Sequence, residues 1–122
     1  MRPWGYCGIR RGIVELDLDR VTVTHNEEAH RFEATVYGLP SLLAYRQFPD
    51  RLVLYHTEVP VPLEGHGIAV KLTLAALDFA RANHLRVIPL CPYVSSFLLK
   101  NREYQDLLSP DDLQKILSIE SA

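Results

Sequence analysis

Alternating apolar and polar positions dominate the first half of the chain and predict a set of β-strands. Residues 31–37 give the clearest case, because three apolar side chains alternate there with charged or polar ones, as expected of a strand with one buried face. The predicted strands are residues 21–24, 31–37, 42–47 and 51–59. Turn signals lie at Gly38-Leu39-Pro40 and Phe48-Pro49-Asp50. Short strands joined by tight turns favour an antiparallel meander.

The spacing of the apolar residues becomes helical after a loop at residues 60–65. Apolar side chains from Ile68 to Ala80 fall on one stripe, which predicts a helix that begins near His66 and ends at Asn83-His84. Residues 85–90 follow as a short apolar strand. This strand is expected to run parallel to the fourth, since a helical crossover returns the chain in the same direction. Two further helices are predicted, from Pro92 through Leu98 and from about Pro110 to Leu117 with Ser109 as its N-cap.

The composition indicates a single domain. The chain has 122 residues, of which 48% are hydrophobic and 23% charged, so it can bury one core and is too short for two linked domains. Residues 1–12 are predicted to form a mobile tail, and residues 13–122 to form the domain. We expect a monomer or a weak dimer.

Charge and cysteine content argue against several classes of protein. Thirteen Lys and Arg against fifteen Asp and Glu give a net charge of −2 without a basic stripe, so no nucleic-acid partner is expected. The longest uncharged run, residues 87–99, contains two prolines and is too short for a membrane span. Cys7 and Cys91 form no CxxC pair, and without a signal peptide a reduced, cytoplasmic protein is expected. No metal site is expected, because His56, His66 and Cys91 lack ligand spacing.

A loop with two glycines precedes the first predicted helix. In Glu64-Gly65-His66-Gly67-Ile68-Ala69 the glycines let a ligand approach the backbone closely, and the helix N-terminus adds a partial positive charge. This combination suits a phosphate or pyrophosphate. The alternative is a tight strand–helix connection without a ligand. The loop is neither a Walker sequence nor GxGxxG.

Cys91 is the second candidate for chemistry. It ends the apolar strand, and Pro92 has the backbone angle of a first helical residue. Cys91 therefore lies at or beside a helix N-cap, where unpaired N–H groups favour a thiolate. The alternative is a small buried residue that only fills space, as cysteine often does.

The end of the fourth predicted strand carries polar side chains. Alternation places His56 and Glu58 on one face, and Thr57 and Val59 on the other. Glu58 is a candidate general base and His56 an alternative one, although both can equally be solvent-facing strand residues. The prolines that follow cannot donate ladder hydrogen bonds, so pairing should stop just beyond Val59 and open a gap toward the fifth strand.

These motifs, in this order, resemble the GNAT N-acetyltransferase superfamily. Its loop motif, Gln/Arg-x-x-Gly-x-Gly/Ala, is matched at Gly67 and Ala69, while Glu64 stands where the family usually has a basic or amide residue. The chain is similar, from about residue 21 to 108, to a compact single-domain branch of that superfamily. The branch motifs read here Thr57-Glu58-Val59-Pro60, Ile88-Pro89-Leu90-Cys91-Pro92-Tyr93-Val94 and Asn101-Arg102-Glu103-Tyr104.

The resemblance implies a fold and a co-substrate. The fold would be the α/β acyl-CoA N-acyltransferase fold: a mixed, mainly antiparallel sheet, with splayed parallel fourth and fifth strands and flanking helices. The co-substrate would be acetyl-CoA, with its acetyl group pointing toward Cys91 and an unknown amine as acceptor. The residues implied in binding it are Thr57, Val59, Glu64, Gly65, His66, Gly67, Ile68, Ala69 and Asn101.

Two chemical routes are open for such an acetyltransferase. In direct transfer, Glu58 or a water-linked His56 removes a proton from the amine, a fourth-strand N–H stabilises the oxyanion, and Tyr93 or Tyr104 protonates the CoA thiolate. In the covalent route, which we favour, Cys91 accepts the acetyl group first. The rival hypotheses are a CoA-binding module without turnover, and an interaction domain without a ligand.

Overall fold

A computed structural model describes residues 21–121, so the predicted tail at residues 1–12 and the start of the domain at residue 13 lie outside the described residues. The described chain forms one sheet with the strand order β1-β2-β3-β4-β5. The strands are β1 (Thr24–Asn26), β2 (Arg31–Val36), β3 (Leu39–Gln47), β4 (Arg51–Glu58) and β5 (Arg86–Pro89). Only β4 and β5 pair in parallel among them, which confirms the predicted mixed sheet.

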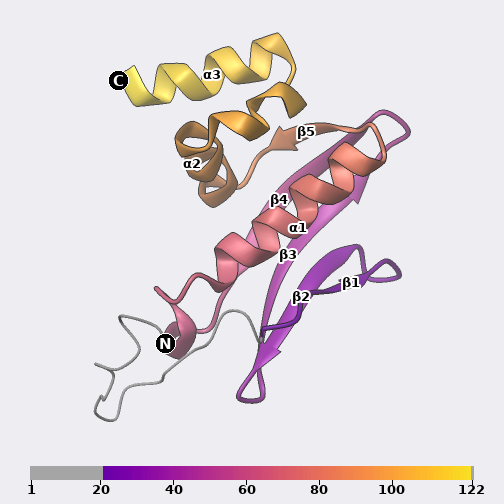
Figure 1. The fold of residues 1–122 in the computed structure, drawn as a ribbon, viewed down its shortest axis with the longest axis vertical. Coiled ribbons are helices and arrows are strands. Elements are labelled where there is room, and N and C mark those ends of the chain that lie inside the picture. Colours follow the sequence, from indigo (N-terminus) through magenta and orange to yellow (C-terminus); the bar gives the residue numbers. More distant parts are fainter. Residues whose placement is uncertain (1–20, 122) are drawn as a thin grey trace.

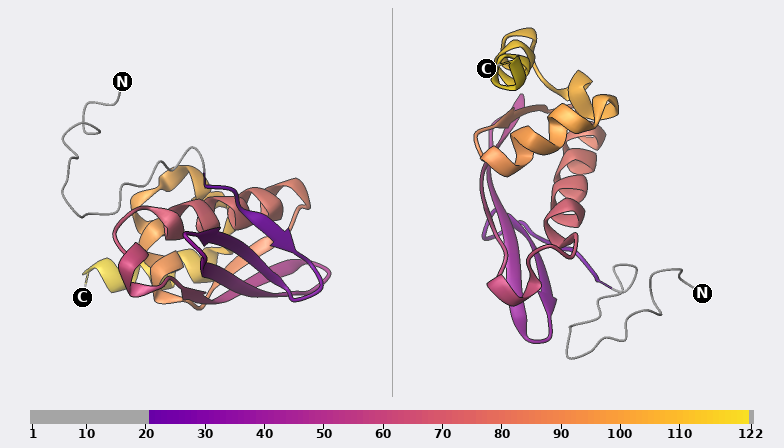
Figure 2. Two further views of the ribbon diagram at one scale, coloured as in Figure 1. Left: turned by 90° about the horizontal axis from the view of Figure 1, so that it is seen from below. Right: turned by 90° about the vertical axis from the view of Figure 1, so that its left-hand side faces the viewer.

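The helices lie on one face of the sheet and beyond its β5 end. They are η2 (Val61–Leu63), α1 (Ile68–Ala82), α2 (Pro92–Lys100), η3 (Arg102–Leu107) and α3 (Pro110–Ser121). The long helix α1 packs along the sheet, whereas α2 and α3 stack on each other at the end near β5 (Figures 1 and 2). The cap predicted for α3 is present, because the Asp112 N–H donates to Ser109 Oγ at 3.2 Å.

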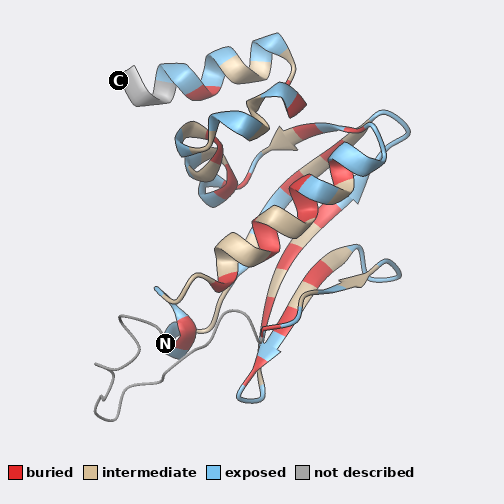
Figure 3. Cartoon of the chain, in the orientation of Figure 1, coloured by how far each residue is buried: buried red, intermediate tan, exposed pale blue. Residues whose placement is uncertain are grey.

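The core lies between α1 and the sheet. Leu43, Leu52 and Leu54 of the sheet are fully buried, as are Leu72 and Ala76 of α1. Figure 3 shows the buried stripe of α1 and the alternating buried positions of β2 and β3. The two periodicities in the sequence therefore produce the two facing layers of one core.

The largest differences from the predicted strand boundaries are in β1 and β3. β1 spans Thr24–Asn26 instead of residues 21–24, and β3 begins at Leu39 instead of residue 42. The other strands differ from the prediction by one residue at one or both ends. The turn between β2 and β3 is made by Tyr37 and Gly38, with φ of 53° and 75°. Two successive positive φ angles suit the twist of a tight hairpin. The ladder therefore continues to the Val36–Leu39 pair, and it includes Leu39 and Pro40, which the sequence had placed in the turn.

An irregularity in β4 determines which side chains face α1 near the end of the strand. In the β3–β4 register, Tyr45 pairs with Leu54 and Ala44 pairs with His56, so Tyr55 is an extra residue in β4. An extra residue of this kind is a β-bulge, and it exchanges the two faces of the strand beyond it.

Candidate functional site

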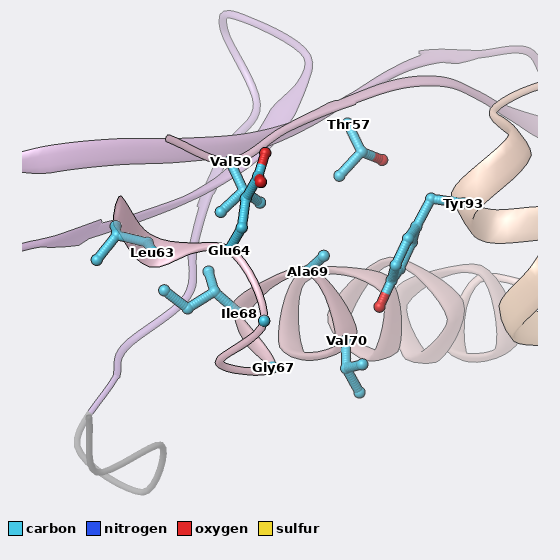
Figure 4. A pocket seen from close by; sticks show the side chains of 10 residues that line it. Thr57, Val59, Leu63, Glu64, Gly67, Ile68, Ala69, Val70 and Tyr93 are labelled. Atoms are coloured by element: carbon cyan, nitrogen blue, oxygen red, sulfur yellow. The ribbon is translucent and has the colours of Figure 1, made fainter. Parts of the chain in front are cut away.

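A cleft of about 450 Å³ opens between the end of β4 and the beginning of α1. Figure 4 shows its walls: β4, η2 and the glycine loop, the first turn of α1, and Tyr93 from α2. The lining residues are Thr57, Val59, Leu63, Glu64, Gly65, Gly67, Ile68, Ala69, Val70 and Tyr93. Most of the predicted cofactor-binding residues therefore lie together.

The glycine loop presents the N-terminus of α1 to this cleft. Gly65 and Gly67 have φ of 82° and 86°, in the left-handed region that favours glycine. Gly67 is the N-cap of α1, and no side chain of the described residues caps this helix. The N–H groups of its first turn have no intrahelical partner, and they carry the positive end of the helix dipole. This wall of the cleft is therefore suited to an anion.

The strands β4 and β5 separate along another wall of the cleft. Their pairing ends where Leu54 meets Pro89, which is earlier than the sequence predicted, although β4 stays paired with β3 up to Glu58. At this point the N–H groups of Leu90 and Cys91 both donate to the Leu54 carbonyl, each at 3.0 Å. The chain then turns into α2, so in the described structure β5 does not pair with the end of β4.

The bulge places Thr57 and Val59 on the cleft side of β4. The predicted division of faces is confirmed, since His56 and Glu58 lie together on the opposite face, where His56 Nε2 is 3.5 Å from Glu58 Oε1. Both of these side chains are more than half exposed. Glu58 therefore does not line the cleft, and it can act as a base only toward an amine that approaches from the other face.

Cys91 has the position that the sequence predicted. It is the N-cap of α2 with extended backbone, Pro92 follows it, and no described side chain caps the helix. Its side chain is buried, with 6% exposed, and its Sγ lies 3.3 Å from Thr57 Oγ1. Cys91 does not itself line the cleft, but it contacts the cleft through Thr57.

Tyr93 extends from α2 across the cleft toward α1 (Figure 4). Burial raises the pKa of its phenol, so the hydroxyl stays protonated and can donate a proton or a hydrogen bond. Tyr104, the alternative acid, lies in η3 beside Arg81 and Phe97 instead of in the cleft. Burial, followed by the nearby Asp78, raises the pKa of Tyr104.

Two of the predicted cofactor-binding residues, Asn101 and His66, do not line the cleft. The Asn101 side chain ends α2 by donating to the Phe97 carbonyl at 2.8 Å, and His66 belongs to the loop but does not line the cleft. Two lining residues were missed, Leu63 and Val70. Leu63 belongs to the short helix η2, a segment that was predicted as a loop because of its prolines. Val70 directly follows the last residue of the glycine motif, Ala69.

Glu64 adds a negative charge to the cleft wall. Its carboxylate extends from the loop toward the end of β4, near Val59 (Figure 4). Among residues 21–121, no cluster of three or more His, Cys, Asp or Glu side chains could hold a metal ion. In the same part of the chain, no helix is long and apolar enough to cross a membrane.

A comparison with protein families identifies the fold that carries this cleft. The family described as GCN5-related N-acetyl-transferase matches residues 31–107, which is more than half of the chain and runs from β2 through η3. The chain belongs to the GCN5-related N-acetyltransferase family. The matched residues include the separated parallel strands β4 and β5 and the glycine loop at the N-terminus of α1. The family resemblance seen in the sequence is therefore confirmed.

Curated relatives are similar along most of their length. Protein NATD1 of Bos taurus is 35% identical over 95 residues, which cover 74% of this chain and 84% of that protein. Proteins of the same name from Mus musculus and Homo sapiens are each 33% identical over 95 residues, covering 86% and 84% of their lengths. The shared part therefore covers more than four fifths of each of these relatives.

Proposed function

We propose that this GCN5-related domain is an acetyltransferase that uses acetyl-CoA to acetylate an amine. The observation that carries the proposal is the cleft, in which an uncapped helix N-terminus with left-handed glycines lies beside the end of β4, which is no longer paired with β5. The first feature suits a pyrophosphate. The second offers backbone groups to the amides of a pantetheine arm, as an added strand would.

Acetyl-CoA can be placed along the cleft by chemistry alone. Its pyrophosphate belongs at the Gly65–Ala69 end, where N–H groups are available. Its pantetheine arm belongs along β4 at Thr57 and Val59, and its thioester then lies near Thr57 and Tyr93. A volume of about 450 Å³ is in the range of small-molecule sites.

The covalent route uses the thiol at the far end of this path. The Cys91 sulfur forms a bond to the acetyl carbon, and the bond from that carbon to the CoA sulfur breaks. Tyr93 donates a proton to the departing CoA sulfur. The proton lost by Cys91 then restores the Tyr93 hydroxyl, so the net proton transfer is from Cys91 to CoA. The amine nitrogen then forms a bond to the acetyl carbon, the bond from that carbon to the Cys91 sulfur breaks, and the proton lost by the amine restores the thiol. In the alternative, direct route, Glu58 accepts the amine proton and Cys91 stays unmodified.

A second candidate is a CoA-binding domain without turnover. Two observations favour it: Cys91 is only 6% exposed, and Glu64 adds a negative charge to the cleft in which the phosphates of CoA would bind. The same cleft serves both candidates, so a binding measurement alone does not separate them.

Intact-mass spectrometry after incubation with acetyl-CoA separates them. The covalent route predicts an acetyl adduct that is absent in Cys91→Ser and present in the matched control Cys7→Ser. Non-covalent CoA without an adduct, and without CoA release in the presence of a panel of amines, would favour the binding domain. Release of CoA with unchanged rate in Cys91→Ser would favour direct transfer.

A further inference from the structure

Thr57 connects the cleft to the Cys91 thiol. Its side chain lines the cleft, and its Oγ1 lies 3.3 Å from Cys91 Sγ. Either the hydroxyl or the thiol can be the donor of this hydrogen bond. Figure 4 shows the Thr57 hydroxyl directed toward α2 and its methyl group toward the cleft. Because Cys91 is buried and does not line the cleft, a reagent that comes from the cleft reaches the sulfur next to Thr57.

The bulge at Tyr55 is what gives Thr57 this position. Without the extra residue, the alternation that buries Leu52 and Leu54 would have pointed His56 into the cleft. With it, Thr57 pairs with the fully buried Leu43 of β3 and faces inward. Threonine is branched at Cβ, so few rotamers are available to its side chain.

The surroundings of the sulfur give this hydroxyl a chemical role. Within residues 21–121, the hydrogen bond that Cys91 Sγ makes to a side chain is the one with Thr57. The other favourable group for a thiolate is the N-terminus of α2, which no described side chain caps. A hydrogen bond to an ionised partner is about twice as strong as one between neutral groups, so the contact gains strength when the thiol ionises.

We infer that Thr57 is a positioning residue: its O–H donates to the ionised Cys91 sulfur and holds it toward the cleft. The inference rests on the covalent route of the proposed function. During acetylation the sulfur forms its bond to the acetyl carbon and the bond to the CoA sulfur breaks. The proton that Cys91 lost ends on CoA, and Thr57 keeps its own proton throughout.

The test uses four variants in a Cys7→Ser background, so that Cys91 is the single thiol. Thr57→Val removes the hydroxyl and keeps the shape, Thr57→Ser keeps the hydroxyl, and Thr57→Ala is a smaller replacement in case the valine variant does not fold. Thr35→Val is the matched control, because Thr35 is an exposed threonine of β2. Melting temperatures establish that each variant is folded.

The readout is the rate of Cys91 alkylation by iodoacetamide as a function of pH, which needs no acetyl-CoA. Cys91 is expected to react about tenfold more slowly at neutral pH in Thr57→Val and Thr57→Ala, because each variant loses one hydrogen bond to a charged group. Their pH profiles should move upward by about one unit. Thr57→Ser and Thr35→Val should match the parent protein. Equal or faster alkylation in folded Thr57→Val, with an unchanged pH profile, would overturn the inference.

Incubation of the same variants with acetyl-CoA separates this inference from the proposed function. Slower formation of the Cys91 adduct in Thr57→Val, with recovery in Thr57→Ser, supports the positioning role. Adduct formation at the parent rate in Thr57→Val overturns it. If the parent protein forms no adduct while its alkylation still depends on the Thr57 hydroxyl, the covalent route fails and the hydrogen bond to the thiolate stands.

Discussion

Replacing Gly65 by alanine separates a stability effect from a binding effect at the glycine loop. Gly65 has φ of 82°, and a Cβ built there meets no atom within 4 Å. Gly38, in the β2–β3 turn, has φ of 75° and is equally open. The two glycines therefore impose the same kind of backbone strain on alanine, and only one of them lies in the cleft.

The expected loss of stability is similar for the two variants. A left-handed conformation costs an L-residue about 1–2 kcal/mol, and the more restricted unfolded chain returns about 0.4–1 kcal/mol. The net loss is then about 1 kcal/mol, which lowers the melting temperature of a domain of this length by about 4 °C. Gly65→Ala and Gly38→Ala should both show this decrease in differential scanning calorimetry.

The expected effect on CoA differs between them. In Gly65→Ala a methyl group is added in open space at a residue that lines the cleft, in the loop where the pyrophosphate is proposed to bind. The affinity for CoA should fall about tenfold, which corresponds to one lost hydrogen bond to a charged group. Gly38→Ala should bind CoA as the unmodified chain does in titration calorimetry. Equal affinities for the two variants would refute the assignment of the phosphate site to this loop.

Three other changes test single residues. Glu64→Gln should strengthen CoA binding about fivefold at low salt, because it removes roughly 1 kcal/mol of repulsion from the cleft wall; titrations at rising salt should show the gain shrinking. Tyr93→Phe should leave CoA binding unchanged and slow CoA release from acetyl-CoA about a hundredfold, as expected for loss of a general acid, and an unchanged rate would remove Tyr93 from that role. Burial lowers the pKa of His25 from 6.5, and Glu27 partly offsets the shift. Because the unfolded chain then binds the proton more readily, stability should fall as pH drops below 6.5, and His25→Gln should flatten this dependence in urea unfolding.

Much of the fold could be predicted because it follows from local patterns. The period of two in β2 and the helical stripe of α1 each define a buried face within one segment. The N-caps at Cys91 and Ser109 are also local, since a proline directly after each residue marks a first helical position. These features depend on neighbours in the sequence, and the structure confirms them.

The parts that could not be predicted depend on contacts between distant segments. The bulge at Tyr55 arises from the register of β4 against β3, which no single segment reveals. The sequence predicted that Thr57 and Glu58 lie on opposite faces of β4, but it did not show which of the two faces the cleft. The bulge decides that Thr57 faces the cleft and that Glu58 does not. The family resemblance implied that Asn101 binds the co-substrate. In the structure its side-chain amide instead donates a hydrogen bond to the Phe97 carbonyl at the end of α2.

The most direct test of the account is a calorimetric titration of the full chain with CoA, together with its melting temperature. We predict one binding site that persists in Cys91→Ser, because the thiol is not needed to hold CoA. At a CoA concentration of about 100 times Kd, the ligand should stabilise the fold by about 2.7 kcal/mol, which raises the melting temperature by several degrees. No heat of binding and no change in melting temperature at millimolar CoA would contradict the central claim that this cleft binds CoA.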